Sequence, residues 1–297
     1  MVLMRMPTAK KIALFCSKMR NMKRIWVCTV FALLFISACK DKPASKADEQ
    51  SQGPAAAESV KPMNYVLAGQ LPHDINAFTE GLFFHNRQLF EGTGSPAELP
   101  QTRSVAGPVD IKTGLIDVKI ELDRNKFFGE GVVILKDKLY QLTYKNQLAF
   151  IYNAATFKSE GSFKYTSAEG WGLTSDGTNL IMSDGTDKLT FIDPKTYKKT
   201  KELNIRANGN PVYYLNELEY VNGYIFANIW MTTQIAKINA TTGNVVGVLD
   251  LAALQNDAKS KNPKCAEMNG IAFHADSGLL WVTGKLWPHI YQIQCEI

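Results

Sequence analysis

Acidic, amide, ammonium and aromatic side chains occur in similar short segments along this chain of 297 residues. Glu80 and Glu130 each precede a glycine, Trp171 lies between two glycines, and Lys285 follows one. Carboxyl groups transfer protons, amide and ammonium groups stabilise developing negative charge, and indole rings form the walls of small pockets. These residue types suggest acid–base chemistry on a small polar substrate, provided that the fold brings them together.

The segments recur at the spacing of propeller blades. Matched at Glu80, Glu130, Trp171, Glu217 and Asn269, they lie 50, 41, 46 and 52 residues apart. A second β-rich segment follows each one after a few turn-forming residues, so each pair is expected to form a β-hairpin. A third strand follows in every repeat and a fourth strand in four of them. The sequence therefore predicts an all-β fold, a five-bladed β-propeller, over residues 63–297.

The last repeat lacks a fourth strand because the chain ends at Ile297. Residues 65–71 (YVLAGQL) precede the first repeat and belong to no blade, so we expect this N-terminal strand to complete the last blade and close the ring. We also expect a turn or more of helix near residues 249–261. A β-sandwich and a six-bladed propeller are the competing folds, but only five units can be counted.

The hairpin geometry predicts where the chemistry lies, since the start of its first strand adjoins the end of its second. First strands start at Glu80, Glu130, Trp171 and Asn216, and second strands end at Tyr144, Trp230 and Lys285. We therefore expect these seven side chains around one mouth of the central channel. Structural roles stay open: Glu80 could bind backbone amides of the next blade, and the tryptophans could pack between blades. Glu217 and Glu219 are interpreted as structural.

Six ordered segments carry a family resemblance: AFTEGL, FGEGV, EGWGL, LNELEY, ANIW and VTGKLWP. They resemble those of the plant-type glutaminyl cyclotransferases, over about residues 64–295. The resemblance implies a five-bladed propeller enzyme that converts the N-terminal glutamine of a peptide or protein to pyroglutamate and releases ammonia. It implies no metal and no cofactor.

The resemblance also assigns residues. It implies that Glu130 is the catalytic acid, and that Asn216 and Lys285 lie at the active site. Trp171 and Trp230 match the family's aromatic pocket walls. Two positions depart from the family pattern, because Glu80 stands where the family usually has glutamine and Tyr144 where it often has tryptophan. These departures bear on substrate affinity more than on reaction type, although a carboxylate at Glu80 would raise the pKa of a nearby Glu130.

Residues 1–39 are expected to be an export leader, with translation starting at Met22. A basic start at Lys23 and Arg24 precedes an apolar run, and residues 36–39 (ISAC) match a bacterial lipobox. This predicts cleavage before Cys39 and lipidation of that residue, with an ordinary signal peptide or an anchoring helix as the alternatives. Residues 40–62, which contain no aromatic side chain, are expected to be a flexible tether. Lys40 after the lipidated cysteine favours the periplasmic side of the outer membrane, with the lipid as the only membrane contact.

Several other functions are disfavoured by the sequence. The net charge of +5 is scattered, so nucleic acid is not an expected partner. The four histidines show no metal-ligand spacing, which argues against a zinc cyclase, and a set of aspartates for a calcium-dependent lactonase is not evident. A non-catalytic surface propeller that binds peptide or sugar is the remaining alternative. Cys265 and Cys295 could pair or stay free, and a monomer is expected.

Overall fold

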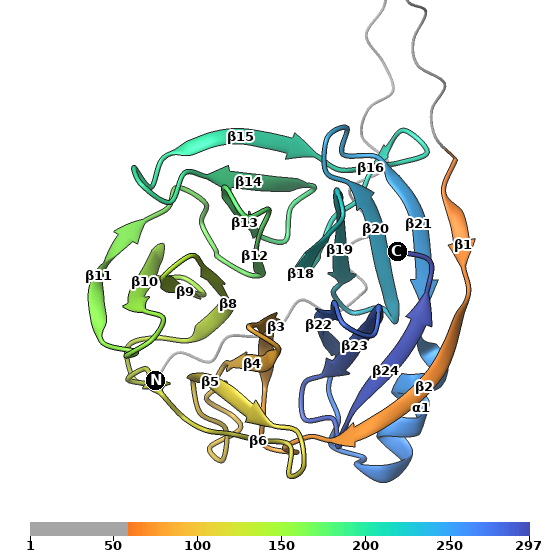
Figure 1. Ribbon diagram of the computed structural model, residues 1–297, viewed down its shortest axis with the longest axis horizontal. Helices are drawn as coiled ribbons and strands as arrows, with labels where there is room; N and C mark the ends of the chain where they lie inside the picture. The colour runs from red at the N-terminus through yellow and green to blue at the C-terminus, as the bar shows by residue number, and fades with distance from the viewer. Residues whose placement is uncertain (1–58) are drawn as a thin grey trace, which may run out of the picture. The chain divides into compact units, whose positions relative to one another are not determined.

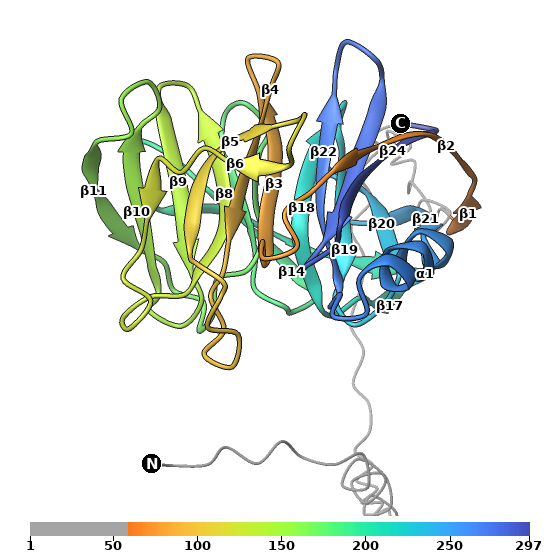
Figure 2. The same cartoon turned by 90° about the horizontal axis from the view of Figure 1, so that it is seen from below.

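A computed structural model describes residues 59–297. The expected leader, with Cys39, and nearly all of the expected tether lie outside the described residues. Five β-sheets are arranged around a central axis, and the first strand of each repeat is innermost (Figure 1). The inner strands run roughly along this axis (Figure 2). The predicted five-bladed propeller is confirmed.

Each blade is built from antiparallel strands that follow one another in the chain, and blades 4 and 5 each gain one strand from the segment before blade 1. Blade 1 contains β3 (Thr79–His85), β4 (Gln88–Thr93), β5 (Val105–Asp110), β6 (Leu115–Ile116) and β7 (Ile120–Glu121). Blade 2 contains β8 (Gly129–Leu135), β9 (Lys138–Thr143), β10 (Leu148–Asn153) and β11 (Ser159–Lys164). Blade 3 contains β12 (Leu173–Ser175), β13 (Leu180–Ser183), β14 (Lys188–Ile192) and β15 (Lys199–Asn204).

The last two blades carry the chain ends. Blade 4 contains β18 (Leu215–Val221), β19 (Tyr224–Ile229), β20 (Gln234–Asn239) and β21 (Val245–Asp250), with β1 (Lys61–Met63) at its outer edge. Blade 5 contains β22 (Met268–His274), β23 (Leu279–Gly284), β24 (His289–Cys295) and β2 (Tyr65–Pro72). A two-stranded hairpin, β16 (Arg206–Ala207) and β17 (Asn210–Pro211), links blades 3 and 4.

Strand β2 closes the ring as predicted. It pairs antiparallel with β24 along its length, from Tyr65 opposite Cys295 to Pro72 opposite His289. The folded part nevertheless begins earlier than the expected boundary at residue 63. Residues Lys61–Met63 form a parallel ladder with β21, and Met63 packs on the core between blades 4 and 5. The sequence did not predict this strand, because the segment contains no aromatic residues and shows no strand pattern. Its pairing uses backbone groups and needs only the open edge of β21.

The expected helix is α1 (Ala252–Lys261), which follows β21. Its Leu254 and Ala258 are buried in the same core as Ile235 and Leu249 of blade 4. Figure 1 shows the helix beside β24, whose Tyr291 hydroxyl donates to Asp257 of the helix at 2.6 Å. Within residues 59–297, no helix has the length and apolar character needed to cross a membrane.

A β-bulge near the start of the inner hairpin is shared by four blades. In blade 2, Gly129 lies opposite Thr143 and Val132 opposite Gln141, with the register shifting between them. Blades 1, 4 and 5 have the same irregularity at the corresponding place. Bulges change the direction of side chains and often lie beside active sites. Here the bulge defines equivalent positions in the repeat.

These positions correct the alignment made from the sequence. The second position holds Glu80, Glu130, Trp171, Asn216 and Asn269, so blade 4 contributes Asn216 rather than Glu217. Glu217 occupies the third position, where the other blades have glycine: Gly81, Gly131, Gly172 and Gly270. The error arose because the acid of blade 4 was matched to the acids of blades 1 and 2.

The third-position glycines allow the inner strands to approach closely. A Cβ on Gly131 would lie 2.4 Å from the Leu173 backbone nitrogen and 2.6 Å from the Trp171 carbonyl oxygen. The Gly131 N–H instead donates to that carbonyl at 2.8 Å, which joins blades 2 and 3. In blade 4 the Glu217 carboxylate accepts hydrogen bonds from the backbone of Leu82 (3.1 Å) and Ile271 (2.8 Å). This acid therefore connects three blades, in agreement with a structural role.

Candidate active site

A cavity of about 150 Å³ lies where the second-position residues meet the ends of the second strands. All seven residues predicted for the site line it: Glu80, Glu130, Tyr144, Trp171, Asn216, Trp230 and Lys285. Three further residues, Phe78, Pro96 and Phe128, complete its wall. The hairpin geometry thus places side chains from all five blades around one small space.

Glu80 and Lys285 form a buried ion pair in this cavity. The Lys285 Nζ lies 2.8 Å from Glu80 Oε1, and the Asn269 side chain donates to Glu80 Oε2 at 3.0 Å. The Lys285 ammonium also lies 4.6 Å from the centre of the Phe78 ring, within reach of a cation–π interaction. Burial lowers the pKa of Lys285, but the carboxylates of Glu80 and Glu130 outweigh it and keep the ammonium charged.

The two carboxyl groups of the cavity influence each other. Burial raises the pKa of Glu80 to about 7, although Lys285 opposes the shift. Burial also raises the pKa of Glu130 well above its usual value, and the negative charge of Glu80 raises it further. Lys285 and Asn269 stabilise the ionised form of Glu80, so the raised pKa makes Glu130 the carboxyl group of the pair that takes up and releases a proton more readily. Glu130 is therefore positioned to exchange a proton with a bound substrate.

Aromatic rings enclose the polar groups. Trp171 and Trp230 meet edge to face with their ring centres 5.6 Å apart, and Phe128 lies 5.9 Å from Tyr144. The Trp171 indole N–H donates to Glu169 at 2.9 Å, which fixes the orientation of the ring. Both tryptophans are partly exposed on one side and line the cavity on the other. They form walls of the cavity rather than only packing between blades.

Sequence reasoning missed Phe78, Pro96 and Phe128. The two phenylalanines share one repeat position, immediately before the first strand of blades 1 and 2, and this regularity could have revealed them. Pro96 lies in the loop between β4 and β5 and had no counterpart in the other repeats. No repeat signal marks it.

Asn216 presents a polar group to the cavity. Its side chain is 4% exposed, and its amide oxygen has no hydrogen-bond partner within residues 59–297. A buried polar atom without a partner is costly in a folded protein unless a ligand satisfies it. Asn216 is thus placed to bind an N–H group of a molecule in the cavity.

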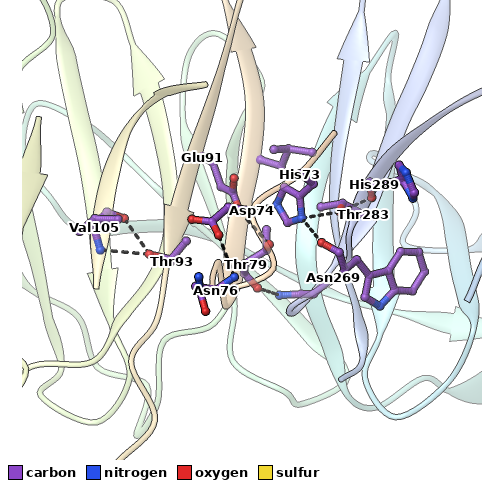
Figure 3. Close-up of polar contacts among 12 residues, drawn as sticks. His73, Asp74, Asn76, Thr79, Glu91, Thr93, Val105, Asn269, Thr283 and His289 are labelled. Atoms are coloured by element: carbon purple, nitrogen blue, oxygen red, sulfur yellow. Dashed lines mark hydrogen bonds and ion pairs between the residues drawn. The ribbon is translucent and has the colours of Figure 1, made fainter. Parts of the chain in front are cut away.

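A buried polar network surrounds Thr79, the residue before Glu80 (Figure 3). The Thr79 hydroxyl donates to Glu91 at 2.7 Å, and Glu91 also lies 3.0 Å from Nε2 of His73. Asn269 donates to the Thr79 carbonyl at 2.9 Å as well as to Glu80. Burial lowers the pKa of His73, but its contacts with Glu91 outweigh this and raise the pKa overall. This network joins β3, β4 and β22 and fixes the backbone that carries Glu80.

Within residues 59–297, no cluster of three or more His, Cys, Asp or Glu side chains has the geometry of a metal site. Cys265 and Cys295 are both free thiols. The Cys265 thiol donates to the Leu286 carbonyl (3.3 Å), and burial raises the pKa of each cysteine to about 11.

Comparisons with known proteins agree with this architecture. The sequence pattern of the family described as "Glutamine cyclotransferase" matches residues 33–295. A glutaminyl-peptide cyclotransferase of Arabidopsis thaliana is 38% identical over 249 residues, which cover 83% of this chain and 76% of the relative. The crystal structure of the Myxococcus xanthus glutaminyl cyclase superposes with a TM-score of 0.71 at 32% identity, covering 80% of this chain and 99% of that one. The chain therefore belongs to the glutamine cyclotransferase family.

Proposed function

We propose that this protein converts the N-terminal glutamine of peptides or proteins to pyroglutamate and releases ammonia, at the cavity between the five blades. The observation that carries the proposal is the pair of buried carboxyl groups, Glu80 and Glu130, beside a buried ammonium and two indole rings. The relatives named above, which carry this activity in their descriptions, support it.

The reaction needs one proton to move between two nitrogen atoms. The α-amine attacks the side-chain carbonyl carbon, a new C–N bond closes the five-membered ring, and the original amide C–N bond breaks. Glu130 takes a proton from the attacking nitrogen and gives one to the departing nitrogen, which leaves as ammonia. A pKa raised well above the usual glutamate value suits both transfers near neutral pH.

Charge develops on the amide oxygen during this attack. The Lys285 ammonium uses one N–H for Glu80 and keeps others for this oxygen, while the Asn216 side chain binds a substrate N–H or the same oxygen. One well-placed donor of this kind is worth about 3–4 kcal/mol in the transition state. Trp171 and Trp230 confine the flexible side chain in a folded conformation, which favours an intramolecular reaction.

The direct test is turnover of Gln-Ala by purified residues 40–297 with and without a metal chelator. Release of ammonia and a mass loss of about 17, the mass of NH₃ lost on ring closure, in both samples supports the metal-free enzyme. Loss of turnover only with chelator would indicate a metal enzyme. No turnover in either sample would favour a non-catalytic binding propeller.

We further propose that the protein is an exported monomer, lipid-anchored through Cys39 to the periplasmic side of the outer membrane. The lipobox-like ISAC at residues 36–39 supports the anchor, and Lys40 supports the choice of membrane. Mass spectrometry of the mature protein is expected to find an acylated N-terminal Cys39, and Cys39→Ser is expected to release the protein from the membrane fraction. An unmodified mature N-terminus elsewhere in the leader would exclude the anchor. Light scattering of the purified protein tests the monomer.

A further inference from the structure

The catalytic cavity has room for little more than one amino-acid residue. Its volume of about 150 Å³ is well below the roughly 300–1,000 Å³ of pockets that hold drug-sized ligands. If the N-terminal glutamine fills it, the rest of a peptide must leave through the mouth and cross the adjoining surface. Phe78, Phe128 and Trp171 line the cavity from blades 1 to 3.

A larger hollow of about 610 Å³ adjoins the mouth between blades 4 and 5. It is lined by the residues that follow the wall residue Trp230, by α1, and by the segment before β22: Met231, Thr232, Thr233, Gln234, Gln255, Lys259, Cys265, Ala266 and Glu267. Two direct connections link this hollow to the cavity. Met231 directly follows Trp230, and the backbones of Ala266 and Glu267 each share a 2.9 Å hydrogen bond with the backbone of Lys285.

Met231 is held outward at the entrance to this hollow. Its side chain is 67% exposed, and its φ of +64° is one that large side chains rarely adopt. The turn is fixed on both sides, because Trp230 donates its N–H to the Tyr214 carbonyl at 2.8 Å and Thr232 donates to the Ile229 carbonyl at 3.1 Å.

One acidic and one basic side chain, Glu267 and Lys259, line different parts of the hollow. Glu267 lies at the mouth, where its charge acts on Glu80 and Lys285. Lys259 projects from α1, is exposed, and has no salt bridge within residues 59–297. The residue next to the glutamine thus meets a carboxylate and an apolar side chain, whereas residues farther along meet an ammonium.

We propose that this hollow binds the peptide residues that follow the N-terminal glutamine, and that Lys259 favours acidic side chains at the third and fourth positions. The inference rests on the proposed function and adds to it a preference among peptide sequences. In this arrangement Met231 contacts the second residue, and the amide side chains of Gln234 and Gln255 line the path of the peptide.

Steady-state kinetics with four substrates test this proposal. Glutamine amide fills only the cavity, and Gln-Ala-Ala-Ala-amide, Gln-Ala-Glu-Glu-amide and Gln-Ala-Lys-Lys-amide extend across the hollow. We expect KM for the acidic peptide to be about three- to fivefold below that for the basic one, a difference that shrinks at high salt. Lys259→Glu should reverse the order, while Lys112→Glu, a matched change on an exposed turn of blade 1, should leave it unchanged. Met231→Ser should raise KM for all three peptides.

The outcomes separate the two proposals. Turnover of glutamine amide with equal KM for the three peptides, or an unchanged order in Lys259→Glu, would overturn the peptide-binding hollow and leave the proposed function standing. Absence of turnover with every substrate would overturn the proposed function and this inference with it.

Discussion

The Lys285 ammonium lies 2.8 Å from the Glu80 carboxylate, and the two side chains are only 8% and 2% exposed. This ion pair stabilises the negative charge of the Glu80 carboxylate inside the cavity. A glutamine at the same position would carry no charge. The charge acts on Glu130, whose pKa is raised by burial and then by Glu80. The departure at Glu80 from the family's usual glutamine therefore changes the electrostatics of the proposed acid.

Glu80→Gln is expected to shift the pH dependence of turnover. Removing the negative charge takes away one cause of the raised pKa of Glu130, so Glu130 ionises at lower pH. The acidic limb of the kcat/KM profile should move toward lower pH by about one unit or less. An acidic limb that stays in place, or moves toward higher pH, would show that Glu80 and Glu130 are not coupled.

Glu130→Gln is expected to abolish turnover while preserving the fold. The amide has nearly the same shape but cannot carry the proton, and loss of a general acid–base group lowers rates by about 10²–10⁴-fold. Ammonia release from Gln-Ala measures the loss, and circular dichroism checks the fold. Glu98→Gln, a matched change on an exposed loop, should keep full activity. Undiminished ammonia release by Glu130→Gln would disprove the assignment.

Gly131→Ala is expected to destabilise the ring. Its Cβ would overlap backbone atoms of Leu173 and Trp171 in the next blade, which cannot move independently. Overpacking of this kind costs about 1–3 kcal/mol in the free energy of unfolding. Gly69→Ala is the control, because there the Cβ meets only the end of the Gln292 side chain. Urea denaturation should show a clear loss for the first variant and little change for the second.

Glu219→Gln is expected to stabilise the protein at alkaline pH. Burial raises the pKa of Glu219 to about 8, although hydrogen bonds from Phe273 and Tyr220 oppose this. An acid with a raised folded-state pKa contributes stability at low pH that is lost as the pH rises through that value. The free energy of unfolding of the variant relative to wild type should therefore be higher at pH ~9 than at pH ~5 by at least about 1 kcal/mol, the worth of roughly one pKa unit. An unchanged difference across this range would show that Glu219 is not protonated at pH ~5.

The sequence predicted the ring and most of the cavity because both follow from a repeat. Equivalent positions in equivalent hairpins meet at one edge, so Glu130 and Lys285 could be placed together although they are far apart in the chain. The details that depend on strand irregularities were less accessible. The shared bulge shows that Asn216 rather than Glu217 is equivalent to Glu80, whereas matching by residue type had paired the two acids.

Two other features depend on contacts that no local pattern encodes. The pairing of Lys61–Met63 with β21 uses backbone groups at an open edge and leaves no hydrophobic alternation in so short a segment. The placement of Pro96 depends on the path of a loop between β4 and β5. The charge state of the cavity also required coordinates, because burial and the neighbouring carboxylates set it.

The pairing of β2 with β24 has a consequence for the order of assembly. β2 (Tyr65–Pro72) precedes all five inner hairpins in the chain, whereas its partner β24 (His289–Cys295) follows the fifth. β2 must therefore stay unpaired until synthesis has passed β24, and such distant pairing slows folding. Deletion of β24 would consequently leave β2 without its pairing strand and β23 with an open edge.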